Sequence, residues 1–102
     1  MLFRSRGGEV TVLNESGTLH RVCGDLDQAG SIHQQALDLA RDIGSSWDEA
    51  HALAGLGKCA LASGHAAEAE ANLRQALEIF QRIGAAEAAE LAAEFDAIRA
   101  AG

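Results

Sequence analysis

Apolar residues recur along most of this chain at the three- and four-residue spacing that is typical of amphipathic helices. The spacing is most regular in residues 26–43 and 66–83, and we expect one helix in each range. The predicted core face of the first is Ala29, Ile32, His33, Ala36, Leu37, Ala40 and Ile43, and that of the second is Ala69, Leu73, Ala76, Leu77, Phe80 and Ile83. Asp25 is expected to cap the first helix, and Gly44 and Gly84 are expected to end the two helices.

Three further helices follow from less regular patterns. A helix over about residues 8–22 is indicated by apolar positions at helical spacing, namely Val10, Leu13 and Leu19. A helix from residue 47 to about residue 63 follows a capping box, in which Ser46 is the expected N-cap and Glu49 the third helical residue. A last helix, over about residues 86–100, has Leu91, Phe95 and Ile98 on one face. The links between helices are short, so consecutive helices should be antiparallel neighbours.

The two most regular helices belong to stretches that repeat one another, residues 24–44 and 64–84. At the offset of 40 residues the identical pairs are Gly24/Gly64, Ala29/Ala69, Gln35/Gln75, Ala36/Ala76, Leu37/Leu77, Ile43/Ile83 and Gly44/Gly84. Repetition at a fixed period is the signature of stacked supersecondary units. The sequence therefore predicts a repeat architecture rather than an unrelated set of helices.

The expected fold is all-α and has five helices. Two helix hairpins, over about residues 8–44 and 47–84, precede a closing helix over about residues 86–100. Residues 1–7 show no periodicity, and we expect a flexible N-terminal arm there, followed by a single domain over residues 8–102.

This pattern resembles the tetratricopeptide repeat, a helix hairpin with small and large residues at fixed places. The matching residues of the second unit are Leu53, Leu56, Gly57, Ala60, Ala69, Leu73 and Ala76, and those of the first are Leu13, Ser16, Gly17, His20, Ala29, His33 and Ala36. The usual repeat has ~34 residues, whereas the offset here is 40. The longer form, which ends in Phe-x-x-Ile-Gly at residues 80–84, is similar to the repeat arrays of bacterial transcriptional and signal-transduction regulators. The resemblance implies an α-solenoid.

In such repeats the first helix of each hairpin lines a concave groove that binds a protein or a peptide. The resemblance assigns to this partner-binding groove Thr11, Asn14, Thr18, Arg21, His51, Ala54, Lys58 and Leu61. Members that bind chaperone tails hold a carboxylate there with Lys, Asn and Arg residues. The corresponding places in this chain hold Asn14, Thr18, Gly55, Leu91 and Phe95, so we do not expect that mode of binding.

The charge of the chain narrows the classes of partner. The formal net charge is −7 and the basic residues do not cluster, which argues against direct nucleic-acid binding because that needs a basic surface. No apolar run approaches the ~20 residues of a membrane span. The two cysteines are expected to be small buried hydrophobic residues of a reduced compartment, and the expected localisation is cytoplasmic.

Candidate catalytic and metal-binding residues are few. His20 and His33 occupy positions that the repeat fills with core aromatic residues, and we expect a buried, hydrogen-bonded pair rather than a metal site, since zinc needs three or four ligands. His65 is expected to be a solvated turn residue and Trp47 to pack at a helix start. The chain contains no nucleophile motif, phosphate loop or zinc motif, so we expect neither an enzyme nor a cofactor.

The leading hypothesis is a non-catalytic regulatory module that binds a protein or peptide in the groove. One alternative is a structural module that self-associates, for example as a homodimer, because two and a half repeats fall short of the three or so that usually bury a continuous core. The other alternative is that the chain is the end of a larger bacterial regulator.

Overall fold

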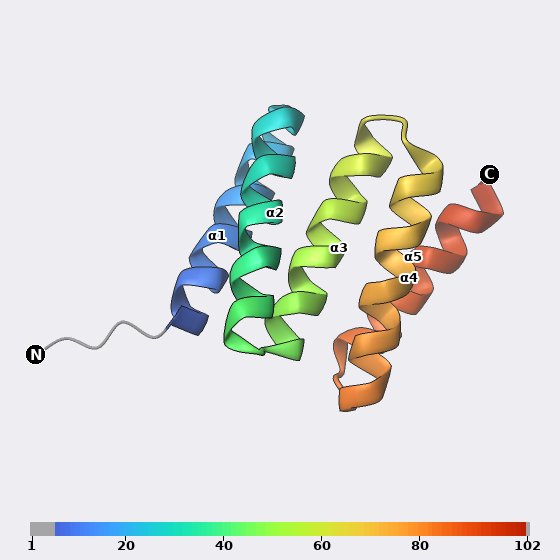
Figure 1. Cartoon of the computed structure of the whole chain (residues 1–102). Coiled ribbons are helices and arrows are strands. Elements are labelled where there is room, and N and C mark those ends of the chain that lie inside the picture. Colours follow the sequence, from blue (N-terminus) through green and yellow to red (C-terminus); the bar gives the residue numbers. More distant parts are fainter. Residues whose placement is uncertain (1–5, 102) are drawn as a thin grey trace, which may run out of the picture.

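The computed structural model describes residues 6–101, and the side chains of residues 8–100. These residues form five helices, α1 (Arg6–Val22), α2 (Leu26–Ile43), α3 (Ser46–Ala62), α4 (Ala66–Ile83) and α5 (Glu87–Ala101), which follow one another across the molecule (Figure 1). The fold is all-α, as the sequence predicts. Of the expected flexible arm, residues 1–5 lie outside the described residues, whereas residues 6 and 7 belong to α1.

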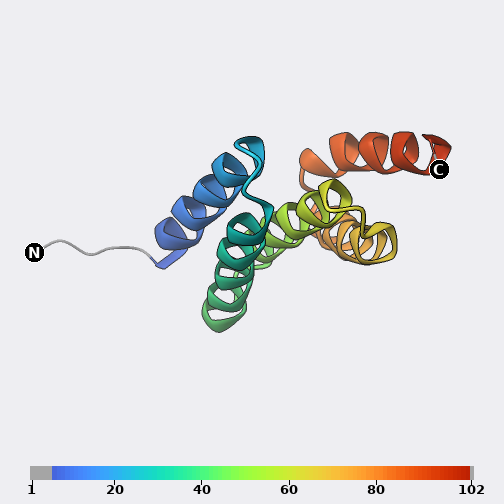
Figure 2. The ribbon, with the colours of Figure 1, turned by 90° about the horizontal axis from the view of Figure 1, so that it is seen from above.

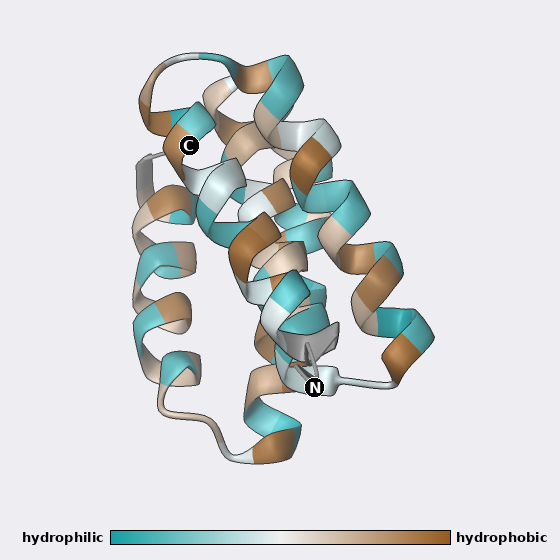
Figure 3. Ribbon diagram, turned by 90° about the vertical axis from the view of Figure 1, so that its left-hand side faces the viewer, coloured by the Kyte–Doolittle hydropathy of each residue, from teal (hydrophilic) through white to brown (hydrophobic). Residues whose placement is uncertain are grey.

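Glycine and capping residues set the helix ends. Gly44 and Gly84 adopt φ of 69° and 72°, and the left-handed conformation lets their N–H groups reach the last carbonyls of α2 and α4. Asp25 accepts a hydrogen bond from the N–H of Gln28 at 3.4 Å, as expected of the cap of α2. Brown and teal segments alternate along the helices in Figure 3, in keeping with their amphipathic pattern.

The predicted N-cap of α3 is one residue too late. Ser45, not Ser46, precedes the helix, and its Oγ accepts from the N–H of Asp48 at 3.3 Å while donating to the Asp48 carboxylate at 2.8 Å. Two adjacent serines are chemically equal candidates for a cap. The position of the left-handed Gly44 decides between them, because it leaves Ser45 as the residue with extended backbone.

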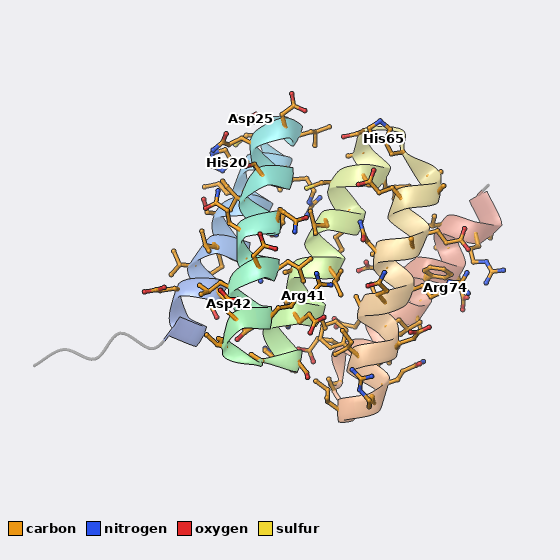
Figure 4. All side chains as sticks on the ribbon, viewed as in Figure 1. His20, Asp25, Arg41, Asp42, His65 and Arg74 are labelled. Carbon is orange, nitrogen blue, oxygen red and sulfur yellow. The ribbon has the colours of Figure 1, made fainter. Side chains whose placement is uncertain are left out.

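The helices pair as two antiparallel hairpins, α1 with α2 and α3 with α4, and α2 packs against α3 to join them. The turns that close the two hairpins lie at the same end of the molecule, where Figure 4 labels Asp25 and His65. Between the hairpins Arg41 of α2 forms an ion pair with Glu49 of α3 at 3.3 Å. Seen from above (Figure 2), α1 and α5 lie on the same side of the array, and α3 lies between them.

The core lies along the hairpin interfaces and consists mainly of alanine and leucine. The predicted core faces of α2 and α4 are buried, except that Ile83 is exposed at the end of α4 and that Ile43 and Leu77 are only partly buried. In α1 the prediction is only partly right. Val10 is fully buried, but Leu19 is exposed and lies on the outer side of the helix with Val12 and Val22.

The closing helix packs less closely than its counterpart in the preceding unit. At the 40-residue offset α5 corresponds to α3, whose backbone lies close to those of α1, α2 and α4, whereas the backbone of α5 lies close to that of α4 alone among the described helices. Phe95 stands where α3 has Gly55, and its ring, with Leu73 and Ile98, lines a cavity of about 320 Å³ beside α4. A bulky ring in place of a glycine keeps the two helices further apart.

Candidate binding groove

A cavity of about 560 Å³ lies between α1 and α3. Seven of the eight residues that the sequence assigns to a groove line it: Thr11, Asn14, Thr18, Arg21, His51, Ala54 and Lys58. The eighth, Leu61, lies outside the cavity and is exposed. Both helices are the first helices of their hairpins, and their helical periodicity brings every third or fourth residue to the same wall.

His33 of α2 forms part of the floor of this groove, although the sequence places it in the core. Its side chain is only 1% exposed, and its ring lies between Gly17 of α1 and Gly55 of α3. A Cβ atom at Gly17 would lie 2.6 Å from His33 Nε2, and one at Gly55 would also collide with the ring. Two glycines on facing helices therefore make the space that the imidazole occupies.

The imidazole of His33 is neutral at pH 7. Burial, followed by the positive charges of Arg21 and Lys58, lowers its pKa from 6.5 to about 4. Its Nδ1 lies 2.9 Å from the Oδ1 atom of Asn14, and an amide oxygen only accepts, so Nδ1 carries the proton and donates. His33 Nε2 is consequently left with a free lone pair.

Two buried polar atoms of the groove have no hydrogen-bond partner within the described part of the chain. They are His33 Nε2, an acceptor, and Arg21 Nε, a donor. An unpartnered buried polar group costs on the order of 1–3 kcal/mol of free energy. A ligand that forms a hydrogen bond with either atom would remove that cost. The groove floor thus presents one unused acceptor and one unused donor.

The wall formed by α3 carries weaker interactions that reach α5 and α4. His51 Nε2 lies 3.4 Å from a carboxylate oxygen of Glu87, and Lys58 Nζ lies 3.6 Å from one of Glu94. His51 also contacts the rings of Trp47 and Phe80, with centroid distances of 4.8 and 5.1 Å. Trp47 packs at the start of α3, as expected, yet remains half exposed at the edge of the groove.

The remaining histidines and cysteines do not form a second site. The expected pair of His20 and His33 is wrong, because His20 Nδ1 bonds the backbone oxygen of Ser16 at 2.8 Å while His33 bonds Asn14. Cys59 is buried, and burial raises the pKa of its thiol, but Cys23 is exposed, contrary to expectation. Over residues 6–101 no group of three or more metal-ligating side chains converges.

Sequence reasoning missed His33 as a groove residue because this position of the repeat normally holds a core side chain. A signal was nevertheless available. At the 40-residue offset His33 corresponds to Leu73, and Asn14 to Ala54, so a polar pair in one unit replaces an apolar pair in the other. Gly55 corresponds to the bulky Phe95 of α5, and it marks the place where α3 packs over the imidazole.

Comparison with known proteins agrees with this architecture. Residues 9–82 match the family model of the tetratricopeptide repeat, which covers both hairpins. The chain belongs to the tetratricopeptide-repeat family. Tetratricopeptide repeats generally mediate protein–protein interactions and are generally non-catalytic. No match was found among curated proteins or among solved structures. None of the described helices of this tetratricopeptide-repeat chain has the length and hydropathy that crossing a bilayer requires.

Proposed function

We propose that this chain is a non-catalytic module that binds a peptide, or an extended segment of another protein, in the groove between α1 and α3. The observation that carries the proposal is the cavity of about 560 Å³, into which side chains of two first helices converge. Its size lies within the usual range of binding pockets, which are mostly apolar and carry a few placed polar groups.

The polar groups of the groove are suited to hydrogen-bond acceptors of a partner. Arg21 and Lys58 contribute cationic donors from opposite walls. The only ion pair found for Lys58 in the described residues joins it to Glu94 at 3.6 Å, between side chains that are 40% and 51% exposed. An exposed pair of this kind contributes little, so Lys58 can exchange Glu94 for a group of the partner at low cost.

The test is a selection of binding peptides from a random-sequence library, followed by affinity measurement with single variants. Arg21→Glu and Lys58→Glu should each weaken binding of the selected peptides by about tenfold or more, because each reverses a charge in the groove. The matched control is Arg82→Glu, which makes the same charge change in the last turn of α4, away from the groove. Unchanged affinity in both groove variants would place binding elsewhere.

A second candidate function is self-association through the outer face of α1. Val12 and Leu19 are 64% and 62% exposed, whereas their counterparts in α3, Ala52 and Cys59, are 0% and 4% exposed. The difference arises because α3 has the preceding hairpin packed against it, and no described helix packs on α1 in the same way. This face therefore offers the stacking surface of a repeat, which a second copy of the chain would cover.

Sedimentation at micromolar and submicromolar concentration tests self-association. A dimer that dissociates in the double variant Val12→Ser, Leu19→Ser is expected, because the variant removes the apolar stripe without touching the groove. The control is Ile83→Ser, which alters an exposed apolar residue of α4. A monomer at both concentrations would exclude this candidate and leave the peptide-binding function unaffected.

A further inference from the structure

The two unpartnered atoms of the groove, Arg21 Nε and His33 Nε2, belong to side chains that lie near one another. Both residues line the same cavity, and the charge of Arg21 acts on His33. One atom can only donate a hydrogen bond and the other, in the neutral ring, can only accept one. A ligand that satisfies both must therefore offer both an acceptor and a donor.

We propose that the groove floor recognises a carboxamide group of the bound peptide. The Nε–H of Arg21 donates to the amide oxygen, and the amide N–H donates to Nε2 of His33. The inference rests on the proposed peptide-binding function and assigns a chemical class to the group that is read in that groove.

The alternatives fit the floor less well. A carboxylate offers acceptors only, so one of its oxygen lone pairs would face the lone pair of His33 Nε2. An ammonium group offers donors only and would meet the guanidinium of Arg21. A hydroxyl group has both functions on a single oxygen, and 1-propanol is therefore one of the comparison probes below.

The second unit shows that packing does not require a histidine at this place. Leu73, the counterpart of His33, lies under Gly57 in the same way that the imidazole lies under Gly17. Ala54 stands in α3 where α1 has Asn14, the residue that holds His33 Nδ1. A leucine and an alanine thus fill the equivalent space, and the His33–Asn14 pair adds a fixed tautomer with a free Nε2 lone pair.

Both atoms are buried and shielded from solvent. The carboxamide must therefore enter by displacing a side chain at the mouth of the groove. Arg21 and Lys58 are the long flexible side chains that line it, and each is only half buried. Arg21 has to stay in place to donate its Nε–H, so the proposal requires Lys58 to move aside.

Titration of small probes, followed by NMR of the protein with ¹⁵N-labelled histidine, tests the proposal at pH 7. Propionamide represents the side chains of asparagine and glutamine, and N-methylacetamide represents a backbone amide. At least one of them should move the His33 Nε2 resonance saturably, and the one that binds more tightly identifies the source of the amide. Propionate and 1-propanol are the comparison probes and should bind at least tenfold more weakly.

The proposal is overturned if neither amide moves the Nε2 resonance, or if propionate or 1-propanol binds as tightly as the better amide. The variant His33→Leu, which introduces the residue found at Leu73 in the second unit, should lose amide binding at least tenfold. The control His65→Gln, at an exposed turn, should keep it. If His33→Leu fails to fold, the wild-type titration decides alone.

Failure of this inference is distinguishable from failure of the proposed function. Peptides selected for groove binding are compared with versions in which each Gln or Asn is replaced by Glu or Asp, at positions where they occur. If Arg21→Glu weakens a peptide but neither amide probe binds, the groove function stands and the carboxamide assignment falls. If the groove variants leave peptide binding unchanged, the proposed function is rejected, and the carboxamide assignment that rests on it is rejected as well.

Discussion

Gly17 determines how closely α1 approaches α2, because the His33 ring occupies the space where a side chain would lie. Gly17→Ala is therefore expected to lower the free energy of unfolding by about 1–3 kcal/mol through overpacking. Gly30→Ala is the matched control, since this helical glycine of α2 has open space around its Cβ position. It should stabilise the chain by roughly 0.5–1 kcal/mol because alanine favours the helix. Urea unfolding of both variants checks the prediction, and a loss of equal size in both would contradict it.

His33 also makes stability depend on pH. Its pKa is about 4 in the folded chain and 6.5 in the unfolded one, so the unfolded chain binds an extra proton between these values. The free energy of unfolding is unaffected above pH 6.5, falls as the pH is lowered through this window, and loses at most roughly 3 kcal/mol from this group.

The comparison of wild type with His33→Leu isolates this contribution, because the two proteins differ at this residue alone. The variant should gain stability relative to wild type as the pH falls from 6.5 to 4, when unfolding is followed by circular dichroism. Arg21 and Lys58, which line the cavity with His33, add their positive charges to the effect of burial in lowering its pKa. A difference between the two proteins that is constant with pH would mean that His33 is not held neutral.

At the scale of the helix, the start of α3 depends on one hydroxyl group. Ser45→Ala is expected to destabilise the chain by about 1 kcal/mol, because the N–H of Asp48 loses its acceptor. Ser46→Ala, one residue further on, should change stability by only a few tenths of a kcal/mol, since Ser46 is already helical. Thermal unfolding of the two variants separates them, and equal losses would place the cap at both serines or at neither.

All five helices could be predicted from the sequence because each has periodic apolar residues, and α2, α3 and α4 also have a glycine or a capping residue at a boundary. Seven of the expected groove residues also share one cavity, because helical periodicity brings them to the same face. Local pattern could not predict the exposure of Leu19 or the loose packing of α5. Both depend on which neighbouring helix is present, and that is a property of the stacked array.

The role of His33 was missed for a different reason. A repeat motif describes an average unit, and it assigns this position to the core. The imidazole reaches the groove floor only because Gly55 of the next unit stands opposite it. A contact between two units cannot be read from the pattern within either one.

At the scale of the whole molecule, stability should vary along the array. Helices α2, α3 and α4 have neighbours on both sides. Helix α5 packs closely against α4 and reaches α3 through the side chains of Glu87 and Glu94, and the outer face of α1 is exposed. In a repeat array each unit is stabilised by its neighbours, so the ends open most easily. Hydrogen exchange should therefore be fastest in α5 and slowest in α3. Protection of α5 equal to that of α3 would contradict the packing seen here.

The replacement of Gly55 by Phe95 in the later unit bears on how many ligand segments one chain can bind. The fold is duplicated, but the groove floor is not, because Leu73 stands in the place of His33 and Phe95 in the place of Gly55. A single chain would then hold one ligand segment. A partner carrying several copies of the recognised segment would gain no avidity from one chain. It would gain avidity only where several chains are linked or associated.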